Sequence, residues 1–216
     1  MNTSGKACHR LGSVSERFES GGRGPGTVSG GQGDPGGVSY GTYQLASRTG
    51  TAAAFLRGEG ARWAALLCDA PGTPGFSAVW KDIALREAAA FASAQHAFIE
   101  RTHYRPVIKA VAAGLGYHLS QRHAEVCDAV WSAAVQHGGA AGLTKTAVTD
   151  ADGKASRATA AHDRAFVEAL YWRRTEYVRA IAARSGAAVR RTLTTVAHRR
   201  YPQELAAALA LFDSGD

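Results

Sequence analysis

Apolar residues recur at the three- and four-residue spacing of amphipathic helices along most of the chain. Leu11, Val14 and Phe18 show this spacing first, and they predict a short helix over residues 10–20 that ends at Gly21. The same pattern predicts further helices over residues 51–70, 77–101, 106–115, 120–137, 158–184, 187–198 and 202–213.

Two segments break the helical pattern. Ten of the 21 positions from Gly21 to Gly41 are glycine, which excludes a helix there. A flexible linker is one interpretation, but the tract runs into Val38–Leu45, which is rich in β-prone residues, so we favour tight turns and short strands. Residues 138–157 are predicted as the other loop. The expected fold is α+β and mostly α, with a small glycine-rich β element after the first helix.

The length of 216 residues favours a single domain over 1–216, with a small β-containing lobe at about 20–50 and a helical lobe at about 51–216. No apolar run of about 18 residues or more predicts a transmembrane segment, and the first residues lack the apolar stretch of a signal peptide. We therefore expect synthesis in the cytoplasm. The net charge of +7 favours an anionic partner such as nucleic acid, lipid or cell wall.

Two acidic residues flank the glycine-rich tract. Glu19 falls in the last turn of the first predicted helix, where the negative helix end and the neighbouring Phe18 would raise its pKa. Asp34 lies among glycines whose backbone N–H groups would keep it ionised. Two such carboxylates across a cleft suit general acid and base catalysis of glycoside hydrolysis. Taken singly, each is more typical of a solvated helix end or of a turn.

The strings Arg17-Phe18-Glu19-Ser20 and Gly33-Asp34-Pro35-Gly36-Gly37-Val38-Ser39-Tyr40-Gly41-Thr42-Tyr43-Gln44-Leu45 carry a resemblance to known enzymes. They resemble the active-site region of lysozyme-superfamily hydrolases, in particular glycoside hydrolase family 46 chitosanases and the chitosanase-like lysozymes of phage particles and type VI secretion effectors. The resemblance implies a lysozyme-like fold. It also implies that Glu19 is the general acid, that Asp34 is the general base, and that Ser39 replaces a threonine that helps to hold the attacking water.

By this resemblance the enzyme would be an inverting glycosidase, with the two carboxyl groups about 6.5–9.5 Å apart. A basic chain suits anionic cell wall better than cationic chitosan, which favours muramidase activity on peptidoglycan strands. Delivery by phage lysis or by a secretion machine would bring it to the cell wall, in the periplasm or outside. A chitosanase-type glycosidase, and a non-catalytic basic phage structural or nucleic-acid-binding protein, are the alternatives.

Four further residues are candidates for substrate contact: Tyr40, Gln44, Gln136 and His137. A helix C-cap is an equally good interpretation of His137. No cofactor or metal is expected, because the eight histidines form no motif with the spacing of metal ligands. We expect no nucleic acid partner, and an immunity protein in the cleft is left open.

Two residue classes are interpreted as structural. The four tryptophans lie on helical patterns, where core packing is the default over sugar stacking: Trp63, Trp80, Trp131 and Trp172. Eight arginines between Arg173 and Arg200 favour a solvated face, with contact to an anionic wall or an outer-membrane-destabilising helix as the alternatives. The resemblance further implies a buried ion network of Arg199 or Arg200 with Glu204.

Overall fold

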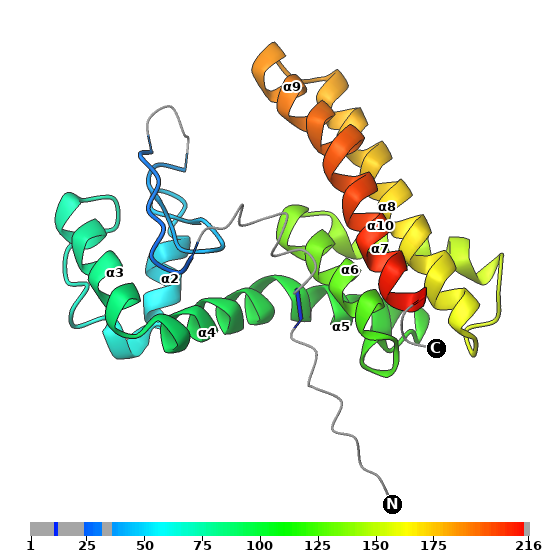
Figure 1. Ribbon diagram of the computed structural model, residues 1–216, viewed down its shortest axis with the longest axis horizontal. Helices are drawn as coiled ribbons and strands as arrows, with labels where there is room; N and C mark the ends of the chain where they lie inside the picture. The colour runs from blue at the N-terminus through cyan, green and yellow to red at the C-terminus, as the bar shows by residue number, and fades with distance from the viewer. Residues whose placement is uncertain (1–10, 13–23, 32–35, 214–216) are drawn as a thin grey trace, which may run out of the picture. The chain divides into compact units, whose positions relative to one another are not determined.

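A computed structural model describes residues 11–12, 24–31 and 36–213. Most of the predicted helix over 10–20 lies outside the described residues. Two strands and a series of helices follow (Figure 1). In chain order they are β1 (Ser39–Tyr40), β2 (Leu45–Ala46), α2 (Thr51–Arg57), the 3-10 helix η1 (Ala61–Trp63), α3 (Pro74–Arg86), α4 (Ala88–Ile99), the π-helix η2 (Glu100–Tyr104), α5 (Arg105–Leu115), the 3-10 helix η3 (Leu119–Gln121), α6 (Ala124–Gln136), α7 (Ala140–Asp152), α8 (Ala160–Ala183), α9 (Ala187–Thr195), the π-helix η4 (Val196–Arg200) and α10 (Tyr201–Asp213).

The fold is mostly helical with one small β element, as the sequence predicts. β1 and β2 pair antiparallel, with Ser39 opposite Ala46 and Tyr40 opposite Leu45. The finer expectation of a lysozyme-like fold stays a prediction. Among the described residues, no helix is both long enough and apolar enough to span a membrane.

The chain divides into two compact units, and one boundary between them falls between Thr102 and His103. The described residues between Glu19 and Thr102 form one unit, which we call the hairpin unit. The remaining described residues form the other, which we call the helical unit.

Aromatic rings fill the core of the hairpin unit. Trp80 is fully buried and contacts several other buried rings, among them Tyr40, Phe91 and Phe55, whose centroids lie 5.2, 4.6 and 5.7 Å from its own. The Trp80 Nε1 atom donates to the Pro25 carbonyl at 2.8 Å, so its one polar group is satisfied inside the core. These contacts fix the glycine-rich turns and the hairpin against α3 and α4.

The helix predicted over 77–101 is two helices. It breaks at Glu87, whose backbone (φ −131°, ψ 39°) leaves the helical region. The Glu87 carboxylate accepts from Trp63 Nε1 at 3.1 Å and pairs with Arg62, contacts that tie it to η1. The first helix also begins earlier than predicted, because Thr73 caps it by accepting from the Phe76 N–H, just before Pro74.

The loop predicted over residues 138–157 is wrong, because most of that segment is α7. Its buried side chains, Ala140, Thr144, Ala147, Val148 and Ala151, follow the spacing of one helix face. They are small, so the contrast between apolar and polar positions is weak. Asp150, Asp152 and Gly153 therefore suggested a turn, whereas Gly153 follows the last turn of the helix.

The long helix α8 is the centre of the helical unit and packs against α6, α7, α9 and α10. Thr159 caps it by accepting from the His162 N–H. Along its length the buried residues include Phe166, Leu170, Arg174 and Val178. A buried arginine needs partners for its charge, and the side chains around Arg174 provide them.

Candidate functional site

The two predicted catalytic carboxylates, Glu19 and Asp34, lie outside the described residues, and the predicted distance between them stays untested. Ser39, the predicted water-holding hydroxyl, begins β1 and is 6% exposed. Its backbone is fixed on both sides, since its N–H donates to Ser29 Oγ at 2.8 Å and its carbonyl accepts from the Ser29 N–H at 2.9 Å.

Tyr40 lies in the core of the hairpin unit with no exposed surface. Its hydroxyl accepts from the Gly72 N–H at 2.9 Å and bonds to Ser77 Oγ at 3.0 Å. Because both bonds are made inside the protein, this position does not favour the predicted contact with sugar hydroxyls, which stays a prediction.

Gln44 sits in the hairpin turn with a positive φ of 56°, a strained conformation for a residue with a side chain. Its Nε2 donates to the Gly41 carbonyl at 3.1 Å. The turn is held from α4 by buried Gln95, which accepts from the Thr42 N–H at 3.2 Å, so closely that a side chain at Gly41 would overlap it. The structure thus places Ser39, Tyr40 and Gln44 on one rigid hairpin.

Gln136 and His137, the other predicted contact residues, lie in the helical unit at the end of α6. They line a groove of about 260 Å³ between helices of that unit. The rest of its wall is largely apolar and aromatic, and it consists of Gly138, Tyr177, Val178, Ile181, Leu193, Val196 and Tyr201. A groove with an apolar wall and a few polar groups is the usual form of a ligand site.

A hydrogen-bonded chain orders the polar end of this groove. Tyr201 donates its hydroxyl proton to Gln136 Oε1 at 3.0 Å, so His137 Nε2, at 2.8 Å from the same hydroxyl, acts as the donor. Burial, with Arg174 and Arg200 nearby, lowers the pKa of His137 to about 3. His137 is therefore a neutral imidazole protonated on Nε2.

Behind the groove lies a buried ionic network. Arg174 and Glu204 have no exposed surface, and Arg174 Nη1 lies 3.5 Å from Glu204 Oε2. Arg174 Nη2 donates to Ser132 Oγ at 2.8 Å and to Gln136 Oε1 at 2.7 Å, and Ser132 in turn donates to Glu204 at 3.0 Å. Because Gln136 belongs to both the network and the groove wall, the network fixes its orientation.

Aromatic side chains complete this network. The Arg174 guanidinium lies 4.7 Å from the ring centroid of Tyr171 and 4.4 Å from that of Tyr201, so two rings flank the charge. The Tyr171 hydroxyl donates to Glu204 at 3.2 Å. Burial raises the pKa of both tyrosines, which keeps the hydroxyls protonated as donors.

Arg200 pairs with Glu204 through Nε, which agrees with one of the two pairings that the resemblance implied, while Arg199 is exposed. Arg174 was missed, because an arginine on a helix is typical of a solvated face. Its spacing of four residues from both Leu170 and Val178 is the signal that places it on the buried face.

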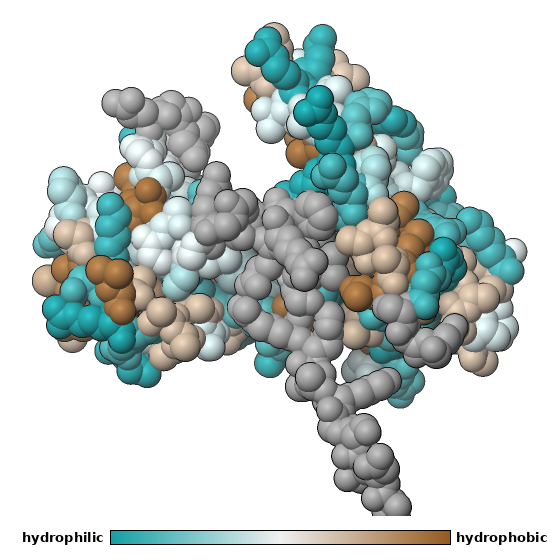
Figure 2. All heavy atoms as spheres, viewed as in Figure 1, coloured by the Kyte–Doolittle hydropathy of each residue, from teal (hydrophilic) through white to brown (hydrophobic). Residues whose placement is uncertain are grey.

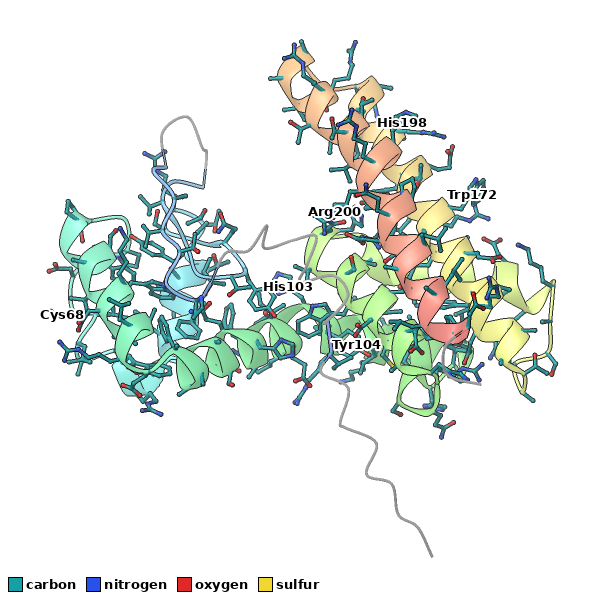
Figure 3. All side chains as sticks on the ribbon, in the orientation of Figure 1. Cys68, His103, Tyr104, Trp172, His198 and Arg200 are labelled. Atoms are coloured by element: carbon teal, nitrogen blue, oxygen red, sulfur yellow. The ribbon has the colours of Figure 1, made fainter. Side chains whose placement is uncertain are left out.

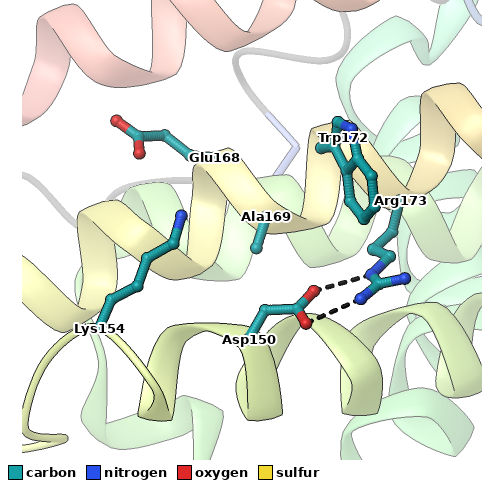
Figure 4. Close-up of a pocket in the computed structure, with 6 residues that line it drawn as sticks. All are labelled: Asp150, Lys154, Glu168, Ala169, Trp172 and Arg173. Atoms are coloured by element: carbon teal, nitrogen blue, oxygen red, sulfur yellow. Dashed lines mark hydrogen bonds and ion pairs between the residues drawn. The ribbon is translucent and has the colours of Figure 1, made fainter.

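A second pocket, of about 500 Å³, lies between α7 and α8 (Figure 4). Arg173 forms a two-point ion pair with Asp150 at 2.7 and 2.8 Å and lies over the Trp172 ring. Trp172 is 54% exposed, so the expectation that it packs in the core is wrong, whereas Trp63, Trp80 and Trp131 are buried. Figure 3 labels Trp172 on the outer side of α8.

Within the residues that the structure describes, no group of three or more His, Cys, Asp or Glu side chains could hold a metal ion. In the same residues Gln136 Nε2 makes no hydrogen bond, so it is available to donate to a carbonyl or hydroxyl oxygen of a ligand. The groove therefore suits an amphipathic ligand with hydrogen-bond acceptors.

Comparison with known proteins defines the family. Residues 11–200 match the family model described as "Type VI secretion system spike protein VgrG3-like, C-terminal". The chain belongs to that family. One relative is the type VI secretion system spike protein VgrG3 of Vibrio cholerae serotype O1 (strain ATCC 39315 / El Tor Inaba N16961). The two are 41% identical over 134 residues, which cover 62% of this chain and 13% of the relative.

This match corrects the family expected from the sequence motifs. The match spans 11–200 and names a spike protein family, not a lysozyme-like or chitosanase-like glycoside hydrolase. The motifs around Glu19 and Asp34 cover a short stretch, and a match along most of the chain outweighs them. The assignment as a peptidoglycan-cleaving muramidase depended on that resemblance and is overturned with it. The type VI secretion context, which the same motifs suggested, is confirmed.

Proposed function

We propose that this chain is a domain that a type VI secretion spike delivers out of the producing cell. The observation that carries the proposal is the match of residues 11–200 to the C-terminal family of VgrG3-like spike proteins. The chain covers 13% of its Vibrio cholerae relative, so a domain of this kind is one part of a much longer spike protein there.

An export experiment tests the proposal. An epitope tag is added to the protein that contains this chain. The amount of tag in the culture medium is then compared between a strain with a working secretion sheath and a sheath-deficient strain. We expect the tag in the medium of the first strain only, with a cytosolic protein as the control for cell lysis. Equal amounts in both media would contradict delivery by this route.

We propose separately that the delivered domain is an enzyme that acts in the periplasm of a recipient cell or outside it. The support is the pair of acidic residues, Glu19 and Asp34, that flank the glycine-rich tract of the sequence in environments expected to differ in pKa. A toxic enzyme of this kind would require an inhibitory partner protein in the producing cell.

The enzyme proposal is tested by toxicity. The chain is expressed in a recipient with and without a periplasmic export signal, as the original sequence and as Glu19→Gln and Asp34→Asn. We expect growth arrest with the exported original chain only. Glu59→Gln is the matched control, because it neutralises a carboxylate that pairs with Arg101 at the surface. Full toxicity of both site variants would overturn the assignment.

A further inference from the structure

The positive charge of this chain is concentrated in one segment. From Tyr177 to Gln203 there are six arginines and one histidine and no aspartate or glutamate. Removing those six from the 25 Lys and Arg residues leaves 19 against 18 Asp and Glu, so the rest of the chain is almost neutral. We call residues 177–203 the arginine arm; its basic residues are Arg179, Arg184, Arg190, Arg191, His198, Arg199 and Arg200.

The arm is the part of the helical unit where α8 ends, α9 turns back and η4 leads into α10 (Figure 1). No residue of α9 is buried. Every basic residue of the arm is exposed except Arg200, which is partly buried beside Glu204. Hydrophilic side chains dominate the end of the arm, with a few apolar ones among them (Figure 2). The arm thus carries a dense positive charge at its surface.

Internal bonds of the arm position Arg184 and Arg190 without neutralising them. Arg184 Nε donates to the Ala180 carbonyl at 3.1 Å, and Arg190 donates to the carbonyls of Ala182 and Ser185 at 3.2 and 3.0 Å. These acceptors lie in the last turn of α8 or just beyond it, where cations are favourable, but a carbonyl carries no net charge. These two guanidinium groups therefore keep their full charge.

The tip of the arm is uncharged and apolar. Ala187, Ala188 and Val189 begin α9 and are exposed, Val189 by 53% of its surface. Arg190 and Arg191 follow directly. Basic side chains around a small exposed apolar tip match the interface of a bilayer, where cations meet headgroup phosphates and apolar groups reach the acyl boundary. A nucleic acid offers the phosphates but no place for the apolar tip.

We propose that the arginine arm is a docking surface for a bilayer of anionic phospholipid. Guanidinium groups bind phosphate oxygens at two points. Arg179 and Arg200 pair with Glu176 and Glu204, and the other four arginines of the arm act together. The attraction is electrostatic and screened beyond about 10 Å at 0.1 M salt, so binding falls as salt rises. The proposal does not depend on delivery or on enzyme activity.

Vesicle sedimentation tests the proposal. The full chain is mixed with vesicles of phosphatidylcholine, with or without phosphatidylglycerol. We expect binding only to the vesicles that contain phosphatidylglycerol. The double variant Arg191→Gln/Arg199→Gln removes two exposed charges and should bind at least about tenfold more weakly. The control Arg57→Gln/Arg86→Gln makes the same change of charge on exposed positions of the hairpin unit and should bind as the original.

A third variant separates lipid from nucleic acid. Val189→Asn keeps every charge and should weaken vesicle binding while leaving binding to duplex DNA unchanged. Circular dichroism confirms that each variant folds. The proposal is overturned if vesicles bind equally with and without phosphatidylglycerol, if both double variants lose binding alike, or if the chain binds DNA but no vesicle.

Discussion

The hairpin unit and the helical unit distribute charge in opposite ways. Residues 19–102 contain seven Lys and Arg and seven Asp and Glu, whereas the remaining residues contain 18 and 11, so the helical unit carries the whole net charge of +7. The interiors of the two units also differ in polarity. Aromatic rings around Trp80 fill the interior of the hairpin unit, whereas the helical unit buries Arg174 and Glu204. Groups able to recognise a charged or polar partner are therefore concentrated in the helical unit.

The two units are therefore stabilised by different interactions, one by burial of aromatic rings and the other in part by a buried ionic network. Burial of rings is non-directional and scales with the apolar area removed from water. Burial of ions is costly, and it persists only where hydrogen bonds satisfy the charges, as those from Ser132 and Tyr171 to Glu204 do. A change in the aromatic core and a change in the ionic network should therefore unfold different parts of the molecule.

The largest effect is expected from Trp80→Ala. It empties a fully buried site against Tyr40, Phe55, Phe76 and Phe91, which should cost roughly 3–5 kcal/mol of the free energy of unfolding. Hydrogen exchange, read peptide by peptide, should rise in the hairpin unit and stay unchanged in the helical unit. An equal rise in exchange in both units would contradict the view that the two units are stabilised separately.

Ser132→Ala is the matched change in the ionic network. It removes a hydroxyl that accepts from Arg174 and donates to Glu204, so both buried charges lose a partner at a cost of about 1–3 kcal/mol. Here exchange should rise in α6, α8 and α10 and not in the hairpin unit. Denaturant titration gives the free energy of unfolding, and Ser185→Ala, which removes a partly buried hydroxyl just beyond the end of α8, serves as the control. A loss no greater than that of the control would show that the network does not depend on Ser132.

The pH dependence of stability should reside in the helical unit as well. His137 has a pKa of about 3 in the folded chain against 6.5 ordinarily, mainly because burial disfavours its charged form. Below pH 6.5 the unfolded chain binds a proton that the folded chain does not, so stability falls as the pH drops from 6.5 toward 3. His137→Asn should flatten this slope above the range where carboxylates titrate, as measured by denaturant titration at several pH values. An unchanged slope would show that the pH dependence of stability comes from groups other than His137.

The smallest effect is expected from Asp150→Asn. Asp150 and Arg173 pair at the edge of the Trp172 pocket, but both side chains are about a third exposed, so the loss should stay below about 1 kcal/mol. Asp82→Asn, at the more exposed pair with Arg86, should lose still less in the same thermal melt. A large loss at Asp150 would show that this pair stabilises the contact of α7 with α8 more than surface pairs do.

The sequence allowed most helices to be predicted, because large apolar residues such as Phe166, Leu170 and Val178 mark one face. It did not predict α7, whose buried face is made of small residues. Nor did it predict the role of Arg174, since charge alone does not distinguish a buried partner of Glu204 from a solvated side chain. The family was misassigned because two short motifs weigh less than similarity along the chain.

The groove was predicted in part. Gln136 and His137 were selected as contact residues, and they do line one groove, because both end α6 beside Tyr201. The apolar wall from α8, α9 and η4 was not predicted. It brings together residues more than forty positions apart, such as Gln136 and Val178, and this depends on how the helices pack rather than on any local pattern.

The central claim is that this chain is delivered by a type VI secretion spike, and transfer between cells tests it most directly. Donor cells that produce the tagged protein are mixed with recipient cells. The recipients are then separated from the donors, and the amount of tag inside them is measured. The account predicts the tag in recipients of donors with a working sheath and none in recipients of sheath-deficient donors. Equal transfer from both donors, or no transfer from either while the donor's other spike cargo arrives, would contradict it.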